Sequence, residues 1–414
     1  MEKLALFGGP KTKSNPFGHG KRFGKEEKKE ILEVIDSDML FYVFGTKVRE
    51  METKMRAMYG AKHCNGCSSG TAAVHIALGA LQLPPGKEVI TSAITDMGTL
   101  TGILYQCLIP RFADIDPHTY NMDPAEVEKL INRKTGAIVA VHHAGLPAEI
   151  EELKTIADRH GLPLVEDCAQ AWYTHYGDRL CGTFGDISAF SLNHFKLITS
   201  GSGGIVVTER DDLEETVKLF IDKCYFRDGR KRNPYFLAPN YQMTELQGAV
   251  AKVQLDKIAE IVRRRNQVGM RLIRGLETIP GVIPQKVPDG REHSFFLLVV
   301  RLDPRIIQAT VAEFCEALES EGIPCEPNKI TGGMATYLYD IFQHRSAFPQ
   351  SAFPFISRDL DSDISYPKGL CPQAELAIDQ TFNFNVNEFY TTADIDQMIR
   401  ATEKVAHYYG IKNV

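Results

Sequence analysis

Between residues 64 and 210, short apolar runs alternate with longer stretches in which apolar residues recur every three or four positions. The short runs, such as Gly-Ala-Ile-Val-Ala-Val at 136–141, are typical of strands buried on both faces, and the longer stretches are typical of helices. The predicted strands span 88–92, 110–113, 136–141, 162–166, 187–192 and 204–208, and the predicted helices span 71–81, 124–132 and 149–160. This alternation predicts an α/β fold with a mostly parallel sheet covered on both faces, in which ligands bind at the carboxyl ends of the strands.

Outside this region the pattern predicts an irregular arm and a second domain. Residues 1–22 are rich in Gly and Pro, which interrupt regular elements, and residues 327–375 are expected to form long loops. Further helices are predicted at 25–35, 47–58, 244–276, 310–320 and 392–409, and a further strand at 294–302. We therefore divide the chain into an N-terminal arm (1–22), a large domain (23–262) and a small C-terminal domain (263–414).

Composition and charge narrow the class of protein. The 414 residues are 43% hydrophobic and 24% charged, as in ordinary soluble globular proteins, and the net charge is −6. No basic run indicates a nucleic-acid partner, and no segment reaches the roughly 18 apolar residues of a membrane span. The apolar run at the start is too short for a signal peptide, so we expect a cytoplasmic protein.

Nine scattered cysteines, an odd number, argue against a disulfide framework. Cys64-x-x-Cys67 is the one pair whose spacing is typical of a zinc site or a redox motif. A zinc site would need a second pair of ligands at suitable spacing, and the sequence offers none, so no metal site is predicted. We interpret the pair as small, partly buried thiols at the edge of a strand, with a redox role as the alternative.

Two polar residues that follow predicted strands indicate cofactor chemistry. Lys196 comes after the strand 187–192 and directly before a polar, glycine-rich run at 199–204 (Thr-Ser-Gly-Ser-Gly-Gly), and Asp167 follows the apolar run 162–165. Enzymes that use pyridoxal phosphate (PLP) need a lysine that forms a Schiff base with the cofactor aldehyde. They also need a carboxylate that keeps the pyridine nitrogen protonated. A lysine near glycines is by itself usually a solvated surface residue, so the hypothesis depends on the other parts of the site.

Other polar residues fit the same cofactor. Ser-Ser-Gly-Thr at 68–71 opens the helix 71–81, and a helix N-terminus beside a glycine offers free N–H groups to a phosphate. A plain N-cap with a glycine turn is the alternative. Gln170 suits the ring hydroxyl on the side of Asp167, or else is solvated. His142 and His143 follow the strand 136–141, and each either faces the cofactor or is structural.

Seven stretches, in order, carry a resemblance to a known family. They are 68–73 (Ser-Ser-Gly-Thr-Ala-Ala), 86–91 (Gly-Lys-Glu-Val-Ile-Thr), 112–116 (Phe-Ala-Asp-Ile-Asp), 141–148 (Val-His-His-Ala-Gly-Leu-Pro-Ala), 166–171 (Glu-Asp-Cys-Ala-Gln-Ala), 182–196 with its terminal lysine, and 240–247 (Asn-Tyr-Gln-Met-Thr-Glu-Leu-Gln). The chain resembles the DegT/DnrJ/StrS family of PLP-dependent sugar aminotransferases, which have the aspartate-aminotransferase (type I) fold. Residues 4–9 are also similar to the start of the cyclitol and aminobenzoate branches. The resemblance covers nearly the whole chain and is looser beyond residue 260.

The resemblance implies a large PLP-binding domain with a mostly parallel, seven-stranded sheet between helices, and a smaller α+β domain. By position, Lys196 matches the Schiff-base lysine, Asp167 the partner of the pyridine nitrogen, and Gln170 the residue at the ring hydroxyl.

The cofactor phosphate is expected to have ligands from two subunits. Gly70, Thr71 and Ser191 match the phosphate ligands of the family. Asn240 matches an asparagine that reaches the phosphate of the neighbouring subunit's cofactor. The resemblance therefore implies a homodimer with shared active sites.

The implied reaction moves an amino group from glutamate or glutamine to a keto sugar or keto cyclitol through a Lys196 Schiff base. Three departures from the family pattern keep alternatives open. Asp96 stands where the family has an aromatic residue stacked on the PLP ring, so either Met97 or a neighbour covers the ring, or Asp96 contacts the cofactor or substrate. Ser202 replaces an acid of the glycine-rich run, and Asn-His-Phe precedes Lys196. The alternatives are a PLP-dependent sugar dehydratase or lyase on the same fold, and a catalytically idle regulatory relative.

The sequence does not identify the acceptor. We predict His293 and Lys329 as substrate contacts, although surface roles are commoner for such residues. A basic cluster near residue 230 could meet a phosphate or a nucleotide diphosphate on the acceptor, or could be a solvated loop. Its members are Arg227, Arg230, Lys231 and Arg232.

Overall fold

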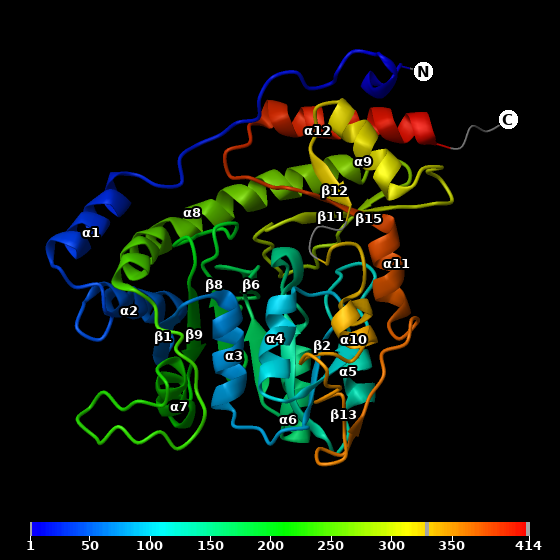
Figure 1. Cartoon of the computed structure of the whole chain (residues 1–414). Helices are drawn as coiled ribbons and strands as arrows, with labels where there is room; N and C mark the ends of the chain where they lie inside the picture. The colour runs from blue at the N-terminus through cyan, green and yellow to red at the C-terminus, as the bar shows by residue number, and fades with distance from the viewer. Residues whose placement is uncertain (1, 328–330, 411–414) are drawn as a thin grey trace.

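The computed structural model describes residues 2–327 and 331–410 and contains one large sheet, one smaller sheet and two short two-stranded sheets (Figure 1). The large sheet has seven strands in the order β1-β9-β8-β5-β4-β2-β3. They are β1 (His63–Cys67), β2 (Glu88–Ser92), β3 (Ile109–Ala113), β4 (Thr135–Val141), β5 (Leu164–Asp167), β8 (Ile187–Ser191) and β9 (Gly204–Thr208). Every neighbouring pair from β8 to β3 is parallel, whereas β9 is antiparallel to both of its neighbours. The predicted mostly parallel, seven-stranded sheet is confirmed.

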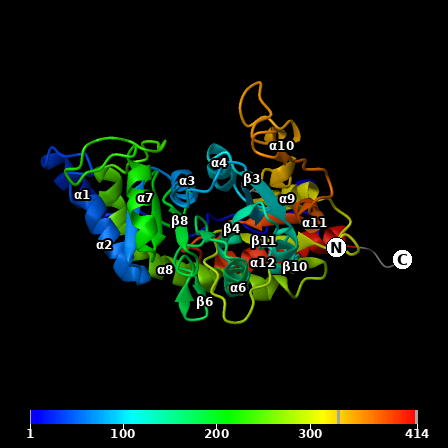
Figure 2. The same cartoon turned by 90° about the horizontal axis from the view of Figure 1, so that it is seen from below.

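Helices cover both faces of this sheet, as Figure 2 shows for α3 and α4 on one side and α6 on the other. One face carries α3 (Gly70–Ala80), α4 (Met97–Tyr105) and α7 (Asp211–Ile221), and the other carries α2 (Lys47–Tyr59), α5 (Pro124–Leu130), α6 (Ile150–His160) and part of α8 (Glu245–Leu276). Each face has its own hydrophobic core. Cys67 lies in the first core and Cys64 in the second, because residues three apart in a strand point to opposite faces. The two thiols of Cys64-x-x-Cys67 are buried and separated by the sheet, so the redox alternative has no support.

The smaller sheet is antiparallel and has the strand order β10-β11-β15-β12. Its strands are β10 (Val282–Pro284), β11 (Leu298–Leu302), β12 (Cys325–Pro327) and β15 (Thr381–Phe384). A third core joins it to α9 (Val311–Ser320), α12 (Thr392–Tyr409) and the end of α8. Helix α8 runs unbroken past residue 262 and packs against both α2 and α12 (Figure 1), so our domain division at that residue stays a prediction.

Several elements were not predicted. The sequence pattern missed α4, because a helix that is buried on most sides shows no polar face. It also missed β1, α7 and most of the small sheet. The predicted long loops contain α10 (Asp340–Gln343), β13 (Ile356–Ser357), β14 (Ser362–Asp363) and the start of α11 (Pro372–Gln380). The remaining elements are α1 (Lys25–Asp36), β6 (His175–Tyr176), β7 (Arg179–Leu180) and short 3-10 turns at Ala5–Phe7, His143–Gly145 and Thr336–Leu338.

The N-terminal arm runs from the small sheet across α8 to α1, largely without regular structure (Figure 1). Buried charges attach it to the small-sheet region. Lys13 Nζ lies 2.5 Å from Asp394 Oδ1, and Glu321 accepts hydrogen bonds from Ala5 N (2.7 Å) and Thr12 Oγ1 (2.7 Å). The path of the arm is therefore set by specific contacts. None of the helices in the described ranges is both long and apolar enough to span a bilayer.

Candidate active site

The carboxyl ends of β5 and β8 open into a pocket of about 310 Å³, a size suited to a small cofactor. Its walls come from these strand ends, from the N-termini of α3 and α4, and from the loop that follows β8. Seven of the predicted site residues line it, namely Gly70, Thr71, Asp96, Asp167, Gln170, Ser191 and Lys196. Residues from five separate stretches of sequence therefore meet where a parallel sheet presents its carboxyl edge.

Lys196 lies in the loop after β8, with its side chain in the pocket. Its Nζ is 4.5 Å from the centre of the Phe296 ring. Burial lowers the pKa of the Lys196 amine, and the nearby carboxylates of Asp167 and Asp96 oppose that shift. An amine with a lowered pKa is more readily neutral, and the neutral form is both the nucleophile and the base.

Asp167 is the last residue of β5, and its carboxylate is buried and held by hydrogen bonds. Oδ2 accepts from Thr99 Oγ1 (2.7 Å), and Oδ1 accepts from Ala169 N (3.0 Å). Burial raises the pKa of this carboxyl, and the hydrogen bond from Thr99 opposes the rise. Thr95 Oγ1 lies 2.7 Å from Thr99 Oγ1, and because the hydrogen of Thr99 goes to Asp167, Thr95 donates in this second contact.

No sequence motif pointed to a role for these two threonines. Thr99 sits on the unpredicted helix α4 and is 68 residues from Asp167, so no local pattern links the two. Their effect is to fix the orientation of the carboxylate before any cofactor binds.

Gln170 and the start of α3 provide further partners for a cofactor. Gln170 Oε1 accepts from Ala144 N (2.7 Å), which leaves Nε2 as a donor.

At the start of α3, Ser69 accepts from the N–H groups of Ala72 and Ala73. The N–H groups of Gly70 and Thr71, the first two of the helix, therefore remain for an anion. A Cβ at Gly70 would lie 2.5 Å from Ser191 Cβ, so only glycine lets these two walls approach.

Asp96 and Met97 differ in their relation to the pocket. Asp96 is the N-cap of α4, where Oδ1 accepts from Gly98 N (2.8 Å), and its side chain lines the pocket. Met97 is half-buried against the core instead, and it is absent from the described pocket lining. The geometry therefore favours Asp96 over Met97 as the residue that meets the cofactor or substrate.

Three other predicted site residues are not among the described residues that line the pocket. Asn240 is exposed, and its backbone pairs with that of Asp222. His293 is buried: its Nδ1 accepts from Phe295 N (2.9 Å) and its Nε2 lies 3.2 Å from Gln285 Oε1. Because both ring nitrogens are used internally, the structure contradicts a substrate contact by His293. Lys329 lies outside the described residues.

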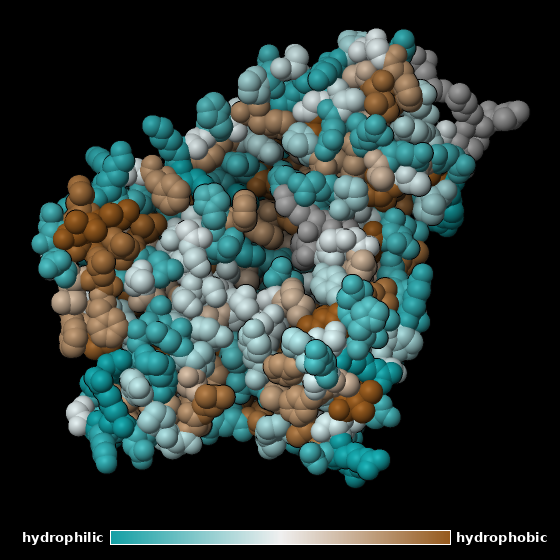
Figure 3. Space-filling model, viewed as in Figure 1, coloured by the Kyte–Doolittle hydropathy of each residue, from teal (hydrophilic) through white to brown (hydrophobic). Residues whose placement is uncertain are grey.

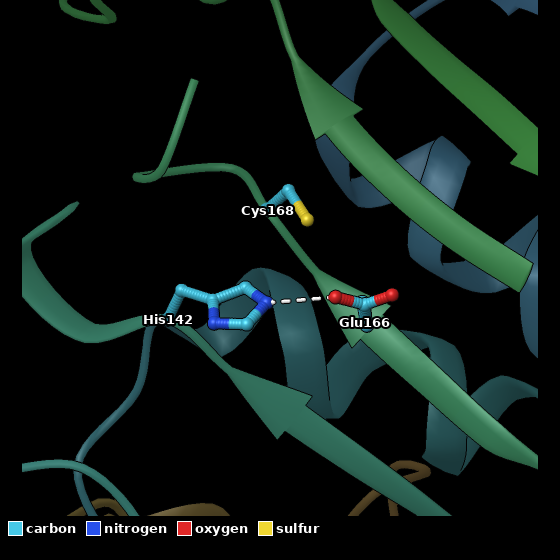
Figure 4. A group of neighbouring side chains, drawn as sticks. All are labelled: His142, Glu166 and Cys168. Carbon is cyan, nitrogen blue, oxygen red and sulfur yellow. Dashed lines mark hydrogen bonds and ion pairs between the residues drawn. The ribbon is translucent and has the colours of Figure 1, made fainter. Parts of the chain in front are cut away.

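Glu166 lies on the face of β5 opposite to Asp167, and it anchors the loop that leads to β8. It accepts hydrogen bonds from the backbone N–H groups of Gly182 (2.7 Å), Phe184 (2.7 Å) and Gly185 (2.6 Å), and from His142 Nε2 (3.1 Å; Figure 4). Burial opposes its charge, but these hydrogen bonds hold the pKa of the Glu166 carboxyl below its usual value.

The ligand atoms of His142, Glu166 and Cys168 lie within 4.8 Å of one another, as metal ligands would (Figure 4). However, His142 Nδ1 accepts from Ala148 N (3.0 Å), and the carboxylate already has four hydrogen-bond donors. We therefore interpret the cluster as a structural support behind Asp167.

The groups in the pocket fit PLP. A buried carboxylate suits a protonated ring nitrogen, and the Gln170 amide suits the ring hydroxyl. The N-terminus of α3 suits a phosphate, and Lys196 is placed among these groups.

Comparison with known proteins agrees with this chemistry. A model of the DegT/DnrJ/EryC1/StrS aminotransferase family matches residues 21–354. Over 391 residues the chain is 29% identical to the spore coat polysaccharide biosynthesis protein SpsC of Bacillus subtilis, covering 92% of this chain and 95% of that protein. Over 344 residues it is 34% identical to a candidate L-glutamine:3-amino-2,3-dideoxy-scyllo-inosose aminotransferase of Streptoalloteichus tenebrarius, covering 78% and 81%.

The fold also matches solved structures. That of 3-amino-5-hydroxybenzoic acid synthase superposes with a TM-score of 0.84 at 24% identity, over 96% of this chain and all of the other. At this level of identity the match supports the type I fold alone.

Proposed function

The chain belongs to the DegT/DnrJ/EryC1/StrS aminotransferase family, and we propose that it moves an amino group from glutamate or glutamine to a keto sugar or keto cyclitol. It is an aminotransferase that uses PLP, as its family does. One observation carries the assignment of residues. Asp167, at the end of β5, and Lys196, in the loop after the neighbouring strand β8, meet in one pocket with the N-terminus of α3.

When bound, PLP supplies an aldehyde carbon that links to amines and a ring that accepts the electrons released at the neighbouring carbon. In the proposal, Lys196 Nζ takes the proton from the α-carbon of the donor and delivers a proton to the acceptor carbon in the reverse half of the reaction. Asp167, held by Thr99, would place its negative charge against the ring nitrogen. Gln170 and the first turn of α3 would hold the ring and the phosphate.

Two of the four cations in the basic cluster of residues 227–232 are already paired with carboxylates of the chain. Arg227 pairs with Asp222 (2.5 Å), and Arg230 pairs with Glu215 (2.8 Å) and Asp228 (2.7 Å). These carboxylates already neutralise both guanidinium groups. Asp96 adds negative charge to the pocket itself, which suits hydroxyl groups as partners better than phosphates. We therefore favour an acceptor whose hydroxyl-bearing ring contacts Asp96.

Absorbance spectra test the reaction. The purified protein with PLP is expected to show the yellow colour of lysine-bound cofactor, to lose it with L-glutamine or L-glutamate, and to regain it with the right keto sugar or keto cyclitol. A yellow protein that neither donor bleaches would indicate a dehydratase or lyase. A protein that never binds PLP would indicate an idle relative.

We also propose that the protein works as a homodimer with shared sites. Figure 3 shows a hydrophobic patch over α1 and the loop after it, where Leu32, Ile35, Leu40 and Phe44 have between 49% and 71% of their surface exposed. Apolar side chains gathered in this way are typical of an interface. Asn240 is exposed near the end of a loop that also exposes Leu237, which suits a side chain that acts in the neighbouring subunit.

Mixing two inactive variants tests this arrangement. Lys196→Ala and Asn240→Ala homodimers should each be impaired. Random re-pairing should then give heterodimers in about half of the molecules, each with one intact site, and so about a quarter of wild-type activity. Activity is measured after mixing, mild dissociation and reassociation, with each variant treated alone as the control. No recovery, despite heterodimers detected by mass spectrometry, would mean that Asn240 acts within its own subunit.

A further inference from the structure

We propose that Arg22, on the N-terminal arm, is a positioning residue for Lys196. In this proposal it holds the backbone of the lysine loop, residues 193–197, in the conformation that directs Nζ into the pocket. The inference rests on the proposed role of Lys196 and adds a role for the arm, which is distant from the lysine in sequence.

One guanidinium group donates to three carbonyl oxygens of this loop. Nη1 donates to the carbonyl of His194 (2.7 Å), and Nη2 donates to those of Leu197 (3.1 Å) and Lys196. Within residues 2–327 and 331–410, no backbone N–H donates to these three oxygens. N–H groups of the loop therefore find acceptors within the loop, as Lys196 N does with Asn193 O (3.0 Å). The three carbonyl oxygens, in contrast, accept hydrogen bonds from Arg22.

Arginine suits this task better than lysine would. Its guanidinium is planar and carries five N–H groups in a rigid fork, so it can bond to several acceptors at fixed angles. A lysine ammonium at the same position would be a point donor on a flexible chain, and it could not span the three carbonyls together. The side-chain type at position 22 is thus matched to the loop that it meets.

Arg22 is itself held by α8. Its carbonyl oxygen accepts from Gln254 Nε2 (3.0 Å) and from Lys257 Nζ (3.2 Å). Gln254 Nε2 also donates to Glu27 Oε1 (2.8 Å). Gln254 Oε1 accepts from the backbone N–H of Thr199 (3.4 Å), which lies just beyond the lysine loop. The arm, α1, α8 and both ends of the loop are therefore joined in one hydrogen-bonded unit.

This unit contacts Lys196 at its backbone carbonyl, while Lys196 Nζ lies 4.5 Å from the centre of the Phe296 ring. If the carbonyl contacts are lost, the loop can turn and move Nζ away from the reacting carbon. A displacement of about 1 Å at a catalytic group costs on the order of 10²-fold in rate. The expected defect is therefore in kcat, because Arg22 contacts the loop and is absent from the described pocket lining.

The test compares the PLP-loaded enzyme with Arg22→Met, Arg22→Lys and a control variant, Lys21→Met, which removes the neighbouring exposed cation of the arm. Arg22→Met is expected to lower kcat about 10²-fold with KM changed less than about threefold, and Arg22→Lys to lie between it and the wild type. Amide hydrogen exchange in residues 193–200 should become faster in Arg22→Met, while Lys21→Met should match the wild type in every measurement.

Two outcomes would overturn the proposal. One is an Arg22→Met enzyme whose kcat and exchange rates match those of Lys21→Met. The other is a loss of activity with unchanged exchange at 193–200 and a lower melting temperature, which would reduce Arg22 to a general structural role. Should the wild-type enzyme transfer no amino group at all, the proposed function would fail, yet the exchange measurement would still decide whether Arg22 orders the loop.

Discussion

Lys196→Ala is expected to abolish amino transfer, with kcat lowered by at least about 10⁴-fold. In the proposed reaction Lys196 serves both as the covalent attachment point and as the acid and base, and general acid–base catalysis alone contributes about 10²–10⁴-fold. The buried amine lies among Asp167, Asp96 and the Phe296 ring, and its loss leaves no other lysine among the described residues that line the pocket.

Steady-state kinetics and absorbance spectra check this expectation. The variant should also lack the yellow colour of lysine-bound PLP, even if it retains some cofactor. Lys218→Ala, which removes an exposed lysine of α7, is the matched control and should behave as the wild type. Partial recovery with added small primary amines would show that the missing function is proton transfer. A Lys196→Ala enzyme that keeps more than about one hundredth of kcat would contradict the assignment.

Asp167→Asn is expected to reduce kcat on the order of 10³-fold. The substitution keeps the shape and the contact with Thr99 but removes the negative charge that stabilises a protonated ring nitrogen. Removing one member of a buried charged pair costs about 3–5 kcal/mol, and each 1.36 kcal/mol corresponds to a factor of ten in rate.

The control for this variant lies at the other end of the same strands. Asp186 precedes β8, and its carboxylate accepts from Leu164 N (2.9 Å) at the start of β5. Asp186→Asn should therefore alter stability slightly and leave kcat within about threefold. Kinetics of both variants, with PLP affinity measured by titration, separate loss of cofactor from loss of catalysis. Equal kcat values for Asp167→Asn and the wild type would remove Asp167 from the mechanism.

The family motifs and the strand pattern in the sequence were sufficient to predict the main parts of the fold. The alternation of β-branched runs with amphipathic segments led to the parallel sheet. The order of motifs around Lys196, Asp167 and 68–73 led to the seven strands and the PLP site. Prediction failed where that signal is weak: α4 is buried on most sides and lacks a polar face, and the loop-like segment 327–375 contains short helices and strands.

Single residues were harder to assign than elements. His293 was predicted as a substrate contact, but its ring is stacked on Phe295 and hydrogen-bonded at both nitrogens. Asp96 and Met97 are adjacent, and only the orientation of the first turn of α4 decides that Asp96 faces the pocket and Met97 the core.

Local patterns, which depend on the spacing of apolar side chains and on motif order, were enough to determine the α/β class, and they led to the lysine–aspartate pair that we propose as the centre of the site. The supports of that pair depend on contacts between distant segments: Thr99 with Asp167, 68 residues apart, and Arg22 with the lysine loop, more than 170 residues apart. Such contacts exist only after the sheet and helices have packed, because packing decides which polar groups lose water and must find partners in the protein.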